Sequence, residues 1–398
     1  MSSGPLEGYK VVELGQGLPA AFAALQLADG GAAVIKVEPR GGDIARTMPP
    51  FWESGESALF VSVNRNKRSI ELDITTPEGR NVLRSLIEDA DVLIEDADLT
   101  REAGLDVETL VADRDQLVHC RISGFGPEGP LAGLPGAEIA AQLASEVTLS
   151  LGSLQNPPVR MGTDVASSYA GLYAAQGILA ALWRRHRDGQ GQRIEVSLFG
   201  SLLAMRATLW AALSNPDEWF GFHTDSYVKP ADYGYQARDG TIMVVVGRMS
   251  DEQWSNLFRE LGLDTALSDE EKQLLRTNGS INARYAHIAK PVWEKALVNF
   301  EVDDLLDIFY RNGGNAYRIN DYPHVFAHPQ TQHLDLLRQV EMQDGTVTVM
   351  RPPWQFSDTP VSVRLSPPAL GQHTDEVLSQ LGYDDEAIRV LRAAGTIG

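Results

Sequence analysis

The chain has 398 residues, a formal net charge of −20 and a hydrophobic fraction of 43%, and such a composition is typical of a globular protein. The negative charge argues against non-specific binding to nucleic acid or to anionic membranes, because both partners would be repelled. The single cysteine, Cys120, excludes an intramolecular disulfide framework and cannot build a zinc site alone, so we expect no resident metal or cofactor. No uniformly apolar run reaches the roughly 20 residues that cross a bilayer, and the first residues lack a signal-peptide pattern. We therefore expect a cytoplasmic protein.

The first third of the chain alternates strand-like and helix-like segments, which is the pattern of a parallel α/β sheet. Pro19 suits the first turn of one predicted helix, and Thr76 followed by Pro77 suits the start of the next. The predicted strands are 9–14, 33–38, 69–73, 91–95, 116–122 and 192–198, and the predicted helices are 19–29, 76–90 and 168–187.

The composition changes near residue 225, where aromatic residues become more frequent and amphipathic helices are predicted at 251–261 and 290–300. The last part returns to the earlier composition and predicts closing helices at 374–381 and 385–394. We therefore expect a large α/β domain over 1–205, a small domain over 225–325, and a return to the large domain over 330–398.

The turn after the first strand, Gly15-Gln16-Gly17-Leu18-Pro19-Ala20, is close to a dinucleotide-binding fingerprint, and Glu38 ends the second strand about twenty residues later. This pattern favours an NAD-dependent oxidoreductase as one alternative. A lone fingerprint is a weak signal, and Pro19 removes one of the N–H groups that a pyrophosphate would use. The glycines also suit a plain strand-to-helix turn.

Five separated blocks resemble one known family in the same order along the chain. Among them, AVIKVEPRGGD occupies 33–43 and NRNKRSIELD occupies 64–73, and the other three blocks occupy 122–130, 189–198 and 368–378. Together they closely resemble the family III CoA-transferases, the group of carnitine CoA-transferase and formyl-CoA transferase. The resemblance implies a Rossmann-like large domain made of both chain ends, a small α+β domain between them, and two subunits interlocked as rings. It also implies that the strand-turn-helix unit binds CoA and not NAD.

CoA carries several phosphate groups, so its binding site needs cations and backbone N–H donors. The resemblance places Arg40, Lys67 and Arg68 at or near these phosphates, and it places the turn formed by Gln16, Gly17 and Leu18 near the thioester. Taken without the family, the same basic residues would suit a solvated loop. We expect CoA or acyl-CoA as substrate and no permanently bound cofactor.

In this family an aspartate attacks the acyl-CoA thioester and stands four positions before a glycine, at the start of a long helix rich in small residues. Counting back four residues from Gly171 gives Ser167, so the nucleophile position is degenerate. A serine would need an activating base, and its acyl ester would be a poor acyl donor to CoA. Asp164 is the one nearby substitute that a different loop register could supply; otherwise it is a cap residue.

Two further departures from the family pattern accompany this serine. After Glu95 the usual acidic-Asn-aromatic-basic-Pro-Gly run is replaced by residues 96–100, which leaves Arg101 as the nearest basic substitute at the CoA site. A glycine expected after Gln142 is Glu146, near the acyl pocket. The family's racemases use a His/Asp pair, but Ala137 and Ser167 occupy those positions, so we exclude racemization.

Three functions remain open. The first is the non-nucleophilic subunit, with a pseudo-active site, of a heteromeric CoA-transferase that moves CoA between carboxylic acids. Succinyl-CoA is a plausible donor, as in succinyl-CoA:benzylsuccinate CoA-transferase, and a homologous subunit would carry the aspartate. The second is a self-sufficient homodimeric CoA-transferase that uses Asp164. The third is a non-catalytic CoA-binding or scaffold protein.

Overall fold

The structure is a computed structural model that describes residues 4–52, 55–145, 147–148, 159–162, 164–207, 234–245, 249–278, 283–342 and 345–398. The chain divides into two compact units. Unit 1 comprises residues 1–145, 161–207 and 333–398, and unit 2 comprises residues 146–160 and 208–332. Unit 1 is therefore built from both ends of the chain.

Unit 1 contains a six-stranded sheet in the order β3-β2-β1-β4-β5-β6, and every neighbouring pair is parallel. The strands are β1 (Lys10–Leu14), β2 (Ala33–Glu38), β3 (Lys67–Glu71), β4 (Val92–Asp96), β5 (Val118–Ser123) and β6 (Gln192–Ser197). The prediction of an α/β fold with a parallel sheet is confirmed. The strand order reverses between β1 and β4, and open parallel sheets bind ligands at such a switch point, beyond the carboxyl ends of the strands.

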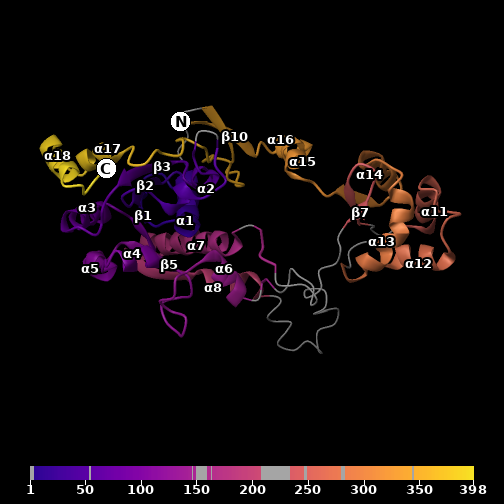
Figure 1. Ribbon diagram of the computed structural model, residues 1–398, viewed down its shortest axis with the longest axis horizontal. Helices are drawn as coiled ribbons and strands as arrows, with labels where there is room; N and C mark the ends of the chain where they lie inside the picture. Colours follow the sequence, from indigo (N-terminus) through magenta and orange to yellow (C-terminus); the bar gives the residue numbers. More distant parts are fainter. Residues whose placement is uncertain are drawn as a thin grey trace. The chain divides into compact units, whose positions relative to one another are not determined.

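Helices cover the sheet of unit 1 (Figure 1). In chain order they are α1 (Leu18–Asp29), the 3₁₀ turn η1 (Ile44–Thr47), α2 (Ala58–Val63), α3 (Pro77–Glu88), α4 (Ala97–Glu102), α5 (Val107–Val111), α6 (Glu138–Ala144), α7 (Val165–Asp188), α8 (Leu198–Met205), α17 (Thr374–Gln380) and α18 (Asp385–Ala393). A short antiparallel hairpin, β10 (Leu337–Met342) and β11 (Gly345–Met350), completes the unit.

Helices α1 and α7 pack closely because small residues line their contact. A Cβ added to Gly171 of α7 would lie 2.9 Å from the carbonyl oxygen of Pro19 and 3.0 Å from Cβ of Phe22. Each helix follows the carboxyl end of a strand or precedes the amino end of one, so both run opposite to the strands and parallel to each other. Their N-termini consequently lie at the same edge of the sheet.

By length and composition α7 alone among the described helices could cross a membrane, a feature that the sequence expectation did not include. More than half of its most apolar window is buried inside the protein, and alanines of its inner face, such as Ala170 and Ala174, are fully buried. Such burial is what a core helix of an α/β unit requires, so α7 gives only weak support for a membrane span.

The C-terminal part of the chain is hydrogen-bonded to β3, beside which α17 lies in Figure 1. The Oδ1 atom of Asn66 accepts the backbone N–H groups of Arg364 and Leu365, at 2.5 and 2.9 Å. The hydroxyl of Ser69 accepts the N–H of Gly371 at 3.0 Å. These contacts explain why the chain ends form one unit.

Unit 2 has its own core beneath a three-stranded antiparallel sheet, with Trp254, Phe258, Trp293 and Phe309 buried together. Its elements are β7 (Tyr235–Gln236), β8 (Thr241–Val245), α11 (Asp251–Glu260), α12 (Asp269–Asn278), α13 (Ala283–Leu297), α14 (Val302–Arg311), β9 (Asn315–Arg318) and α15 (Tyr322–Ala327), and α16 (Pro329–His333) reaches the boundary with unit 1.

Candidate functional site

The turn between β1 and α1 and the end of β4 lie on the two sides of the switch point. The carboxylate of Asp96, the last residue of β4, accepts the backbone N–H of Gln16. A Cβ added to Gly15 would lie 3.6 Å from Cβ of Asp96. The predicted Gln16-Gly17-Leu18 turn is therefore located where a doubly wound sheet binds its ligand.

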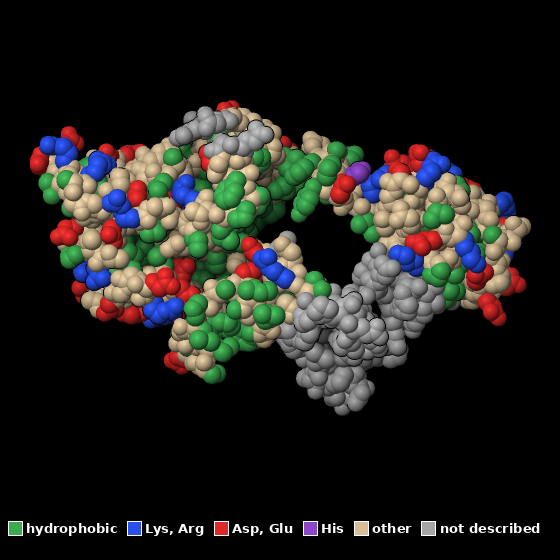
Figure 2. Space-filling view, in the orientation of Figure 1, with side chains coloured by type: hydrophobic (Ala, Val, Ile, Leu, Met, Phe, Trp, Pro, Cys, Tyr) green, Lys and Arg blue, Asp and Glu red, His purple; other side chains and the backbone are tan. Residues whose placement is uncertain are grey.

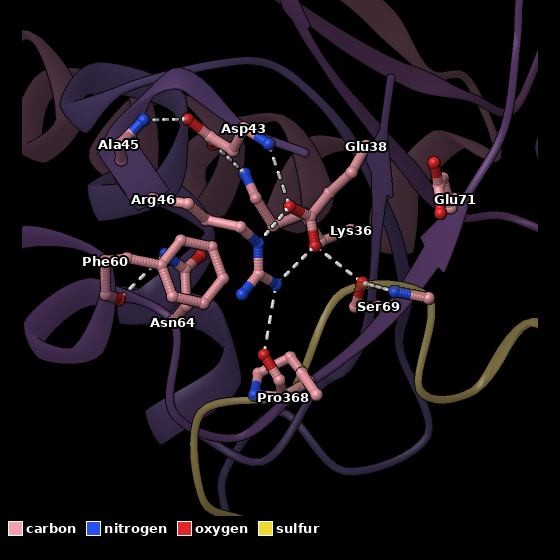
Figure 3. A network of polar contacts seen from close by, with 12 residues as sticks. Lys36, Glu38, Asp43, Ala45, Arg46, Phe60, Asn64, Ser69, Glu71 and Pro368 are labelled. Carbon is pink, nitrogen blue, oxygen red and sulfur yellow. Dashed lines mark hydrogen bonds and ion pairs between the residues drawn. The ribbon is translucent and has the colours of Figure 1, made fainter. Parts of the chain in front are cut away.

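Gly17 is held by a buried carboxylate from the segment that follows β2. Its backbone has φ of +66°, a conformation that residues with a Cβ rarely adopt. Its N–H donates to Oδ1 of Asp43 at 2.8 Å, and the same oxygen accepts the N–H of Ala45 at 2.7 Å. Figure 3 shows the Asp43 carboxylate pointing toward Ala45 and Lys36. The turn is consequently fixed from the β2 side as well as from β4.

A fully buried group of charges supports this carboxylate. Nζ of Lys36 lies 2.6 Å from Oδ2 of Asp43 and 2.7 Å from Oε1 of Glu13. Burial acts to lower the pKa of Lys36, but Asp43 and Glu13 outweigh it and hold that pKa above its ordinary value. Lys36 also donates to the carbonyl of Gly15 at 3.2 Å. Lys36 therefore remains charged and ties the start of the turn to Asp43.

These contacts argue physically against the dinucleotide alternative. A pyrophosphate would need the N–H groups of the turn, yet the N–H of Gln16 is bound to Asp96 and the N–H of Gly17 to Asp43. Two carboxyl groups thus occupy the position that a dinucleotide's phosphates would take. A neutral part of a ligand fits this turn better than an anion.

Asp96 itself is a perturbed acid. Burial raises its pKa to about 6, although the N–H groups of Asp98 and Leu99 donate to it and act in the opposite direction. The nearby charge of Asp98 raises the pKa further. The switch point therefore contains a group that changes its charge near neutral pH.

Ser167 lies in the first turn of α7 and is 5% exposed. One turn later Gly171 packs against Pro19, so Ser167 lies beside the start of α1. Glu138, the first residue of α6, accepts the N–H of Ala166 at 2.9 Å and the N–H of Ser167 at 2.8 Å. The start of α7 is thus capped by a carboxylate from another helix, which complements the positive end of the helix dipole.

Glu138 is positioned by a close contact of two glycines. A Cβ added to Gly124, just after β5, would lie 2.3 Å from Cα of Gly136, so neither position has room for a side chain. Asp98 accepts the N–H of Gly136 at 2.6 Å. The loop after β4 and the loop after β5 therefore bring Glu138 to the helix start at Ser167.

The structure separates the three cations that were expected together at the CoA phosphates. Arg40 follows β2 at the carboxyl edge, and its side chain is 51% exposed, with contacts to Glu71 and to the carbonyl of Gly395. Arg40 is thus an exposed cation at the carboxyl edge of the sheet.

Lys67 does not occupy a phosphate-binding position in this conformation. Its ammonium group is fully buried and contacts Glu13 at 2.8 Å, the carbonyl of Ala21 at 2.8 Å and Oδ1 of Asn64 at 2.9 Å. Burial lowers its pKa to about 8, with a further contribution from Lys36, while Glu13 opposes the shift. Because its three donors have protein partners, Lys67 stabilises the sheet.

Arg68 points to the other face of the sheet, because successive side chains in a strand alternate. It contacts Glu376 and Gln380 of α17 and lies near the amino end of β3, away from Arg40. Arg101, in α4, forms an ion pair with Asp98 at 2.7 Å and is largely exposed. Arg101 therefore lies at the loop that positions Glu138.

Two other predicted positions complete the comparison with the sequence. Asp164 is the N-cap residue of α7, with no hydrogen bond from its side chain to the helix start. Glu146 lies outside the described residues. Sequence reasoning did not assign roles to Asp43, Asp96 and Glu138. The signal for the first two was an acidic residue just after a predicted strand, at the edge where ligands bind.

In the part of the chain that the structure describes, no group of three or more His, Cys, Asp and Glu side chains could hold a metal ion.

Comparison with known proteins identifies the family of the chain. Residues 6–374 match the model of CoA-transferase family III, and the chain belongs to that family. A succinate–glutarate CoA-transferase of Agrobacterium fabrum is 35% identical over 95% of this chain and 96% of its own length. The beta subunit of succinyl-CoA–L-malate CoA-transferase of Chloroflexus aurantiacus is 30% identical over 99% of this chain and 98% of its own.

Among solved structures, a CAIB/BAIF family protein from Brucella suis has a TM-score of 0.81 and 32% identity, covering 96% of this chain and all of its own. CoA thioesters are the substrates of CoA-transferases, and no permanent cofactor is indicated. The α/β fold and the family are thus established together.

Proposed function

We propose that the chain is the non-nucleophilic subunit of a CoA-transferase that moves CoA between carboxylic acids, with succinyl-CoA as donor. A homologous subunit then supplies the aspartate. The observation that carries this proposal is Ser167, which occupies the nucleophile position in the first turn of α7. Relatives named for succinyl-CoA support the donor, and a relative that is a beta subunit supports the partner.

A carboxylate nucleophile makes every intermediate an activated acyl group. Its oxygen attacks the thioester carbon, the C–S bond breaks, and CoA thiolate leaves behind a mixed anhydride. The thiolate attacks the aspartyl carbon and expels the donor acid, and the acceptor carboxylate then repeats the two steps in reverse. Ser167 would form an ordinary ester after losing its proton to a base, and a thiolate reverses such an ester poorly.

Glu138 does not replace the missing nucleophile. Its two oxygens accept the N–H groups of Ala166 and Ser167 and the side-chain amide of Gln142, at 2.9, 2.8 and 2.7 Å. A carboxylate whose oxygens accept three hydrogen bonds is held in place with its lone pairs engaged, which lowers its reactivity as a nucleophile. We assign Glu138 to the capping of α7.

The bound CoA would place its phosphates toward Arg40 and its thioester toward the turn at Gln16 and Gly17. Arg40 is an exposed cation at this edge, while Asp43 and Asp96 disfavour an anion at the turn itself. The thioester carbonyl would then lie near the starts of α1 and α7, where Ser167 is located.

A second subunit has an apolar surface on which to pack. Ile139 and Leu143 of α6 are 41% and 58% exposed, and Leu179 and Trp183 of α7 are 43% and 66% exposed. Figure 2 shows hydrophobic side chains gathered on the visible face of unit 1. Exposed apolar surface of this kind is typical of subunit interfaces, which supports the interlocked dimer that the family resemblance implies.

A self-sufficient enzyme using Asp164 is the second candidate. Residues three apart at a helix start lie about 5–6 Å from each other, and Asp164 precedes Ser167 by three. Its carboxylate would serve only if the acyl group were shifted by that distance, so this candidate requires a different placement of the substrate.

The test is acyl exchange between isotopically labelled succinate and succinyl-CoA, followed by mass spectrometry, with CoA binding measured on the same preparation. We expect the chain alone to bind CoA without exchange, and exchange to begin when a homologous subunit carrying the aspartate is added. Exchange by the lone chain would contradict the dependent-subunit role, and its loss in Asp164→Asn would establish the second candidate. A lone chain that binds neither CoA nor succinyl-CoA would overturn both.

A further inference from the structure

We propose that Asp43 is a positioning residue that holds the Gln16-Gly17 peptide in the orientation needed to bind the thioester half of CoA. The inference rests on the proposed function, because it assigns a task to a residue of the same site. Asp43 is 1% exposed and would not contact the ligand. Its effect would pass through the N–H of Gly17, to which it is hydrogen-bonded at 2.8 Å.

The turn is fixed at three points by residues on its β2 side. Asp43 binds the N–H of Gly17, Lys36 binds the carbonyl of Gly15 at 3.2 Å, and the N–H of Ile44 donates to Oε1 of Gln16 at 3.3 Å. Asp43 belongs to two of these contacts, because it also forms an ion pair with Lys36. A glycine with positive φ has wide conformational freedom, so the orientation of the peptide depends on these contacts.

Asp43 is itself held in place by Glu38, which Arg46 binds in turn. Its own N–H donates to Oε2 of Glu38 at 3.0 Å, and Glu38 is bound by Arg46 through two hydrogen bonds of 2.7 Å. The guanidinium of Arg46 lies 3.6 Å from the centre of the Phe60 ring, as Figure 3 shows. A side chain fixed at its backbone and at both oxygens adopts a single orientation, which a positioning role requires.

Removing Asp43 alone would leave the buried charge of Lys36 without one of its two partner carboxylates. The group around it has two anions, Glu13 and Asp43, and two cations, Lys36 and Lys67. A variant that loses one member of each sign keeps the group neutral and is expected to fold. Lys36→Met combined with Asp43→Asn or with Asp43→Ala gives a matched pair. The asparagine oxygen still accepts the N–H of Gly17, and alanine does not.

The experiment measures the dissociation constants of two ligands by calorimetry in wild type and in both double variants. The ligands are succinyl-CoA and adenosine 3′,5′-diphosphate, which is the nucleotide half of CoA. We expect the alanine variant to bind succinyl-CoA about tenfold more weakly than the asparagine variant, because the hydrogen bond from the N–H of Gly17 to the side chain at position 43 is lost. Binding of the nucleotide should agree within about twofold between the two variants.

A general folding defect would weaken both ligands equally, and that result would overturn the positioning role, as would equal binding of succinyl-CoA by the two variants. Failure of the wild type to bind either ligand would instead overturn the proposed function. Should the alanine variant not fold, hydrogen exchange of the wild-type Gly17 amide still tests the inference. The amide should exchange about 100-fold more slowly than in an unfolded peptide, and unprotected exchange would contradict the hydrogen bond to Asp43.

Discussion

Helices α1 and α7 begin beside each other at the carboxyl edge of the sheet, and an acidic side chain from another element binds the free N–H groups at each start. At α1 the acids are Asp43 and Asp96, which come from the segment after β2 and from the end of β4, on the two sides of β1. At α7 the acid is Glu138, which comes from α6. The two helix starts are therefore capped in the same way, but they differ in the residues that they offer to the site.

The start of α1 contains the residues that the family resemblance leads one to expect, and its turn is held by a buried group of charges. The start of α7 contains Ser167 at the position where the family resemblance leads one to expect the aspartate. Under the proposed function, the start of α1 serves the binding of CoA, while the start of α7 depends on an aspartate from another subunit.

The largest expected effect comes from restoring the carboxylate. Ser167→Asp should raise label exchange by the lone chain at least about 100-fold over wild type, since loss of a nucleophile commonly costs far more than this. Ser167→Asn is the matched control, because it has the size of aspartate and no nucleophilic oxygen anion. A folded Ser167→Asp protein without exchange would show that more than the nucleophile is missing at α7.

The second effect concerns the cap of α7. Glu138→Ala should lower the free energy of unfolding by about 2 kcal/mol, because two backbone N–H groups and the Gln142 amide lose their acceptor. Glu138→Gln keeps one acceptor without the charge, so about half of that loss is expected. Urea denaturation measures both. Equal stability of all three proteins would mean that Glu138 has no capping role.

Local patterns were enough to predict the sheet and the turn, because each depends on residues close together in the sequence. The strand at 33–38 and the turn at Gly15 to Gly17 follow from apolar runs and glycine positions. The third strand was predicted at 69–73 and is observed at Lys67–Glu71. The predicted strand begins too late because a lysine does not indicate a buried strand position, and Lys67 is buried.

The acids at the helix starts could not be assigned roles in this way. Glu138 and Ser167 are brought together by a contact of Gly124 with Gly136. No pattern in the sequence indicates that the segments containing these two glycines meet. Lys67 and Arg68 were grouped with Arg40 because all are cations near each other in the sequence. The alternation of strand side chains and the burial of Lys67 separate them.

The third prediction tests that separation. Arg40→Ala should weaken CoA binding about tenfold, because a charge-assisted contact with phosphate would be lost. Arg68→Ala should change it less than about twofold, since Arg68 faces α17 on the other side of the sheet. Calorimetric titration with CoA measures both. A larger loss in Arg68→Ala would mean that the phosphates lie on the side of the sheet that faces α17, which would contradict our proposal.

The smallest expected effect concerns Asp96, whose pKa of about 6 lies above the value of about 4 for an unfolded aspartate. A raised folded pKa means that the folded protein binds this proton more tightly than the unfolded chain does. The stability that Asp96 provides is therefore fully present below pH 4 and is lost as the pH rises through 6. At neutral pH the buried charge destabilises the start of α1.

Asp96→Asn should remove this dependence. The difference in pKa corresponds to at most about 3 kcal/mol, and the weaker amide acceptor for the N–H groups of Asp98 and Leu99 offsets part of it. We expect the variant to be about 1 kcal/mol more stable than wild type at pH 7.5, with the advantage gone near pH 5. Urea denaturation of both proteins across this range isolates Asp96, because the other titrating groups cancel in the difference. A difference that stays constant with pH would assign the titration to another group and leave both helix starts insensitive to pH in this range.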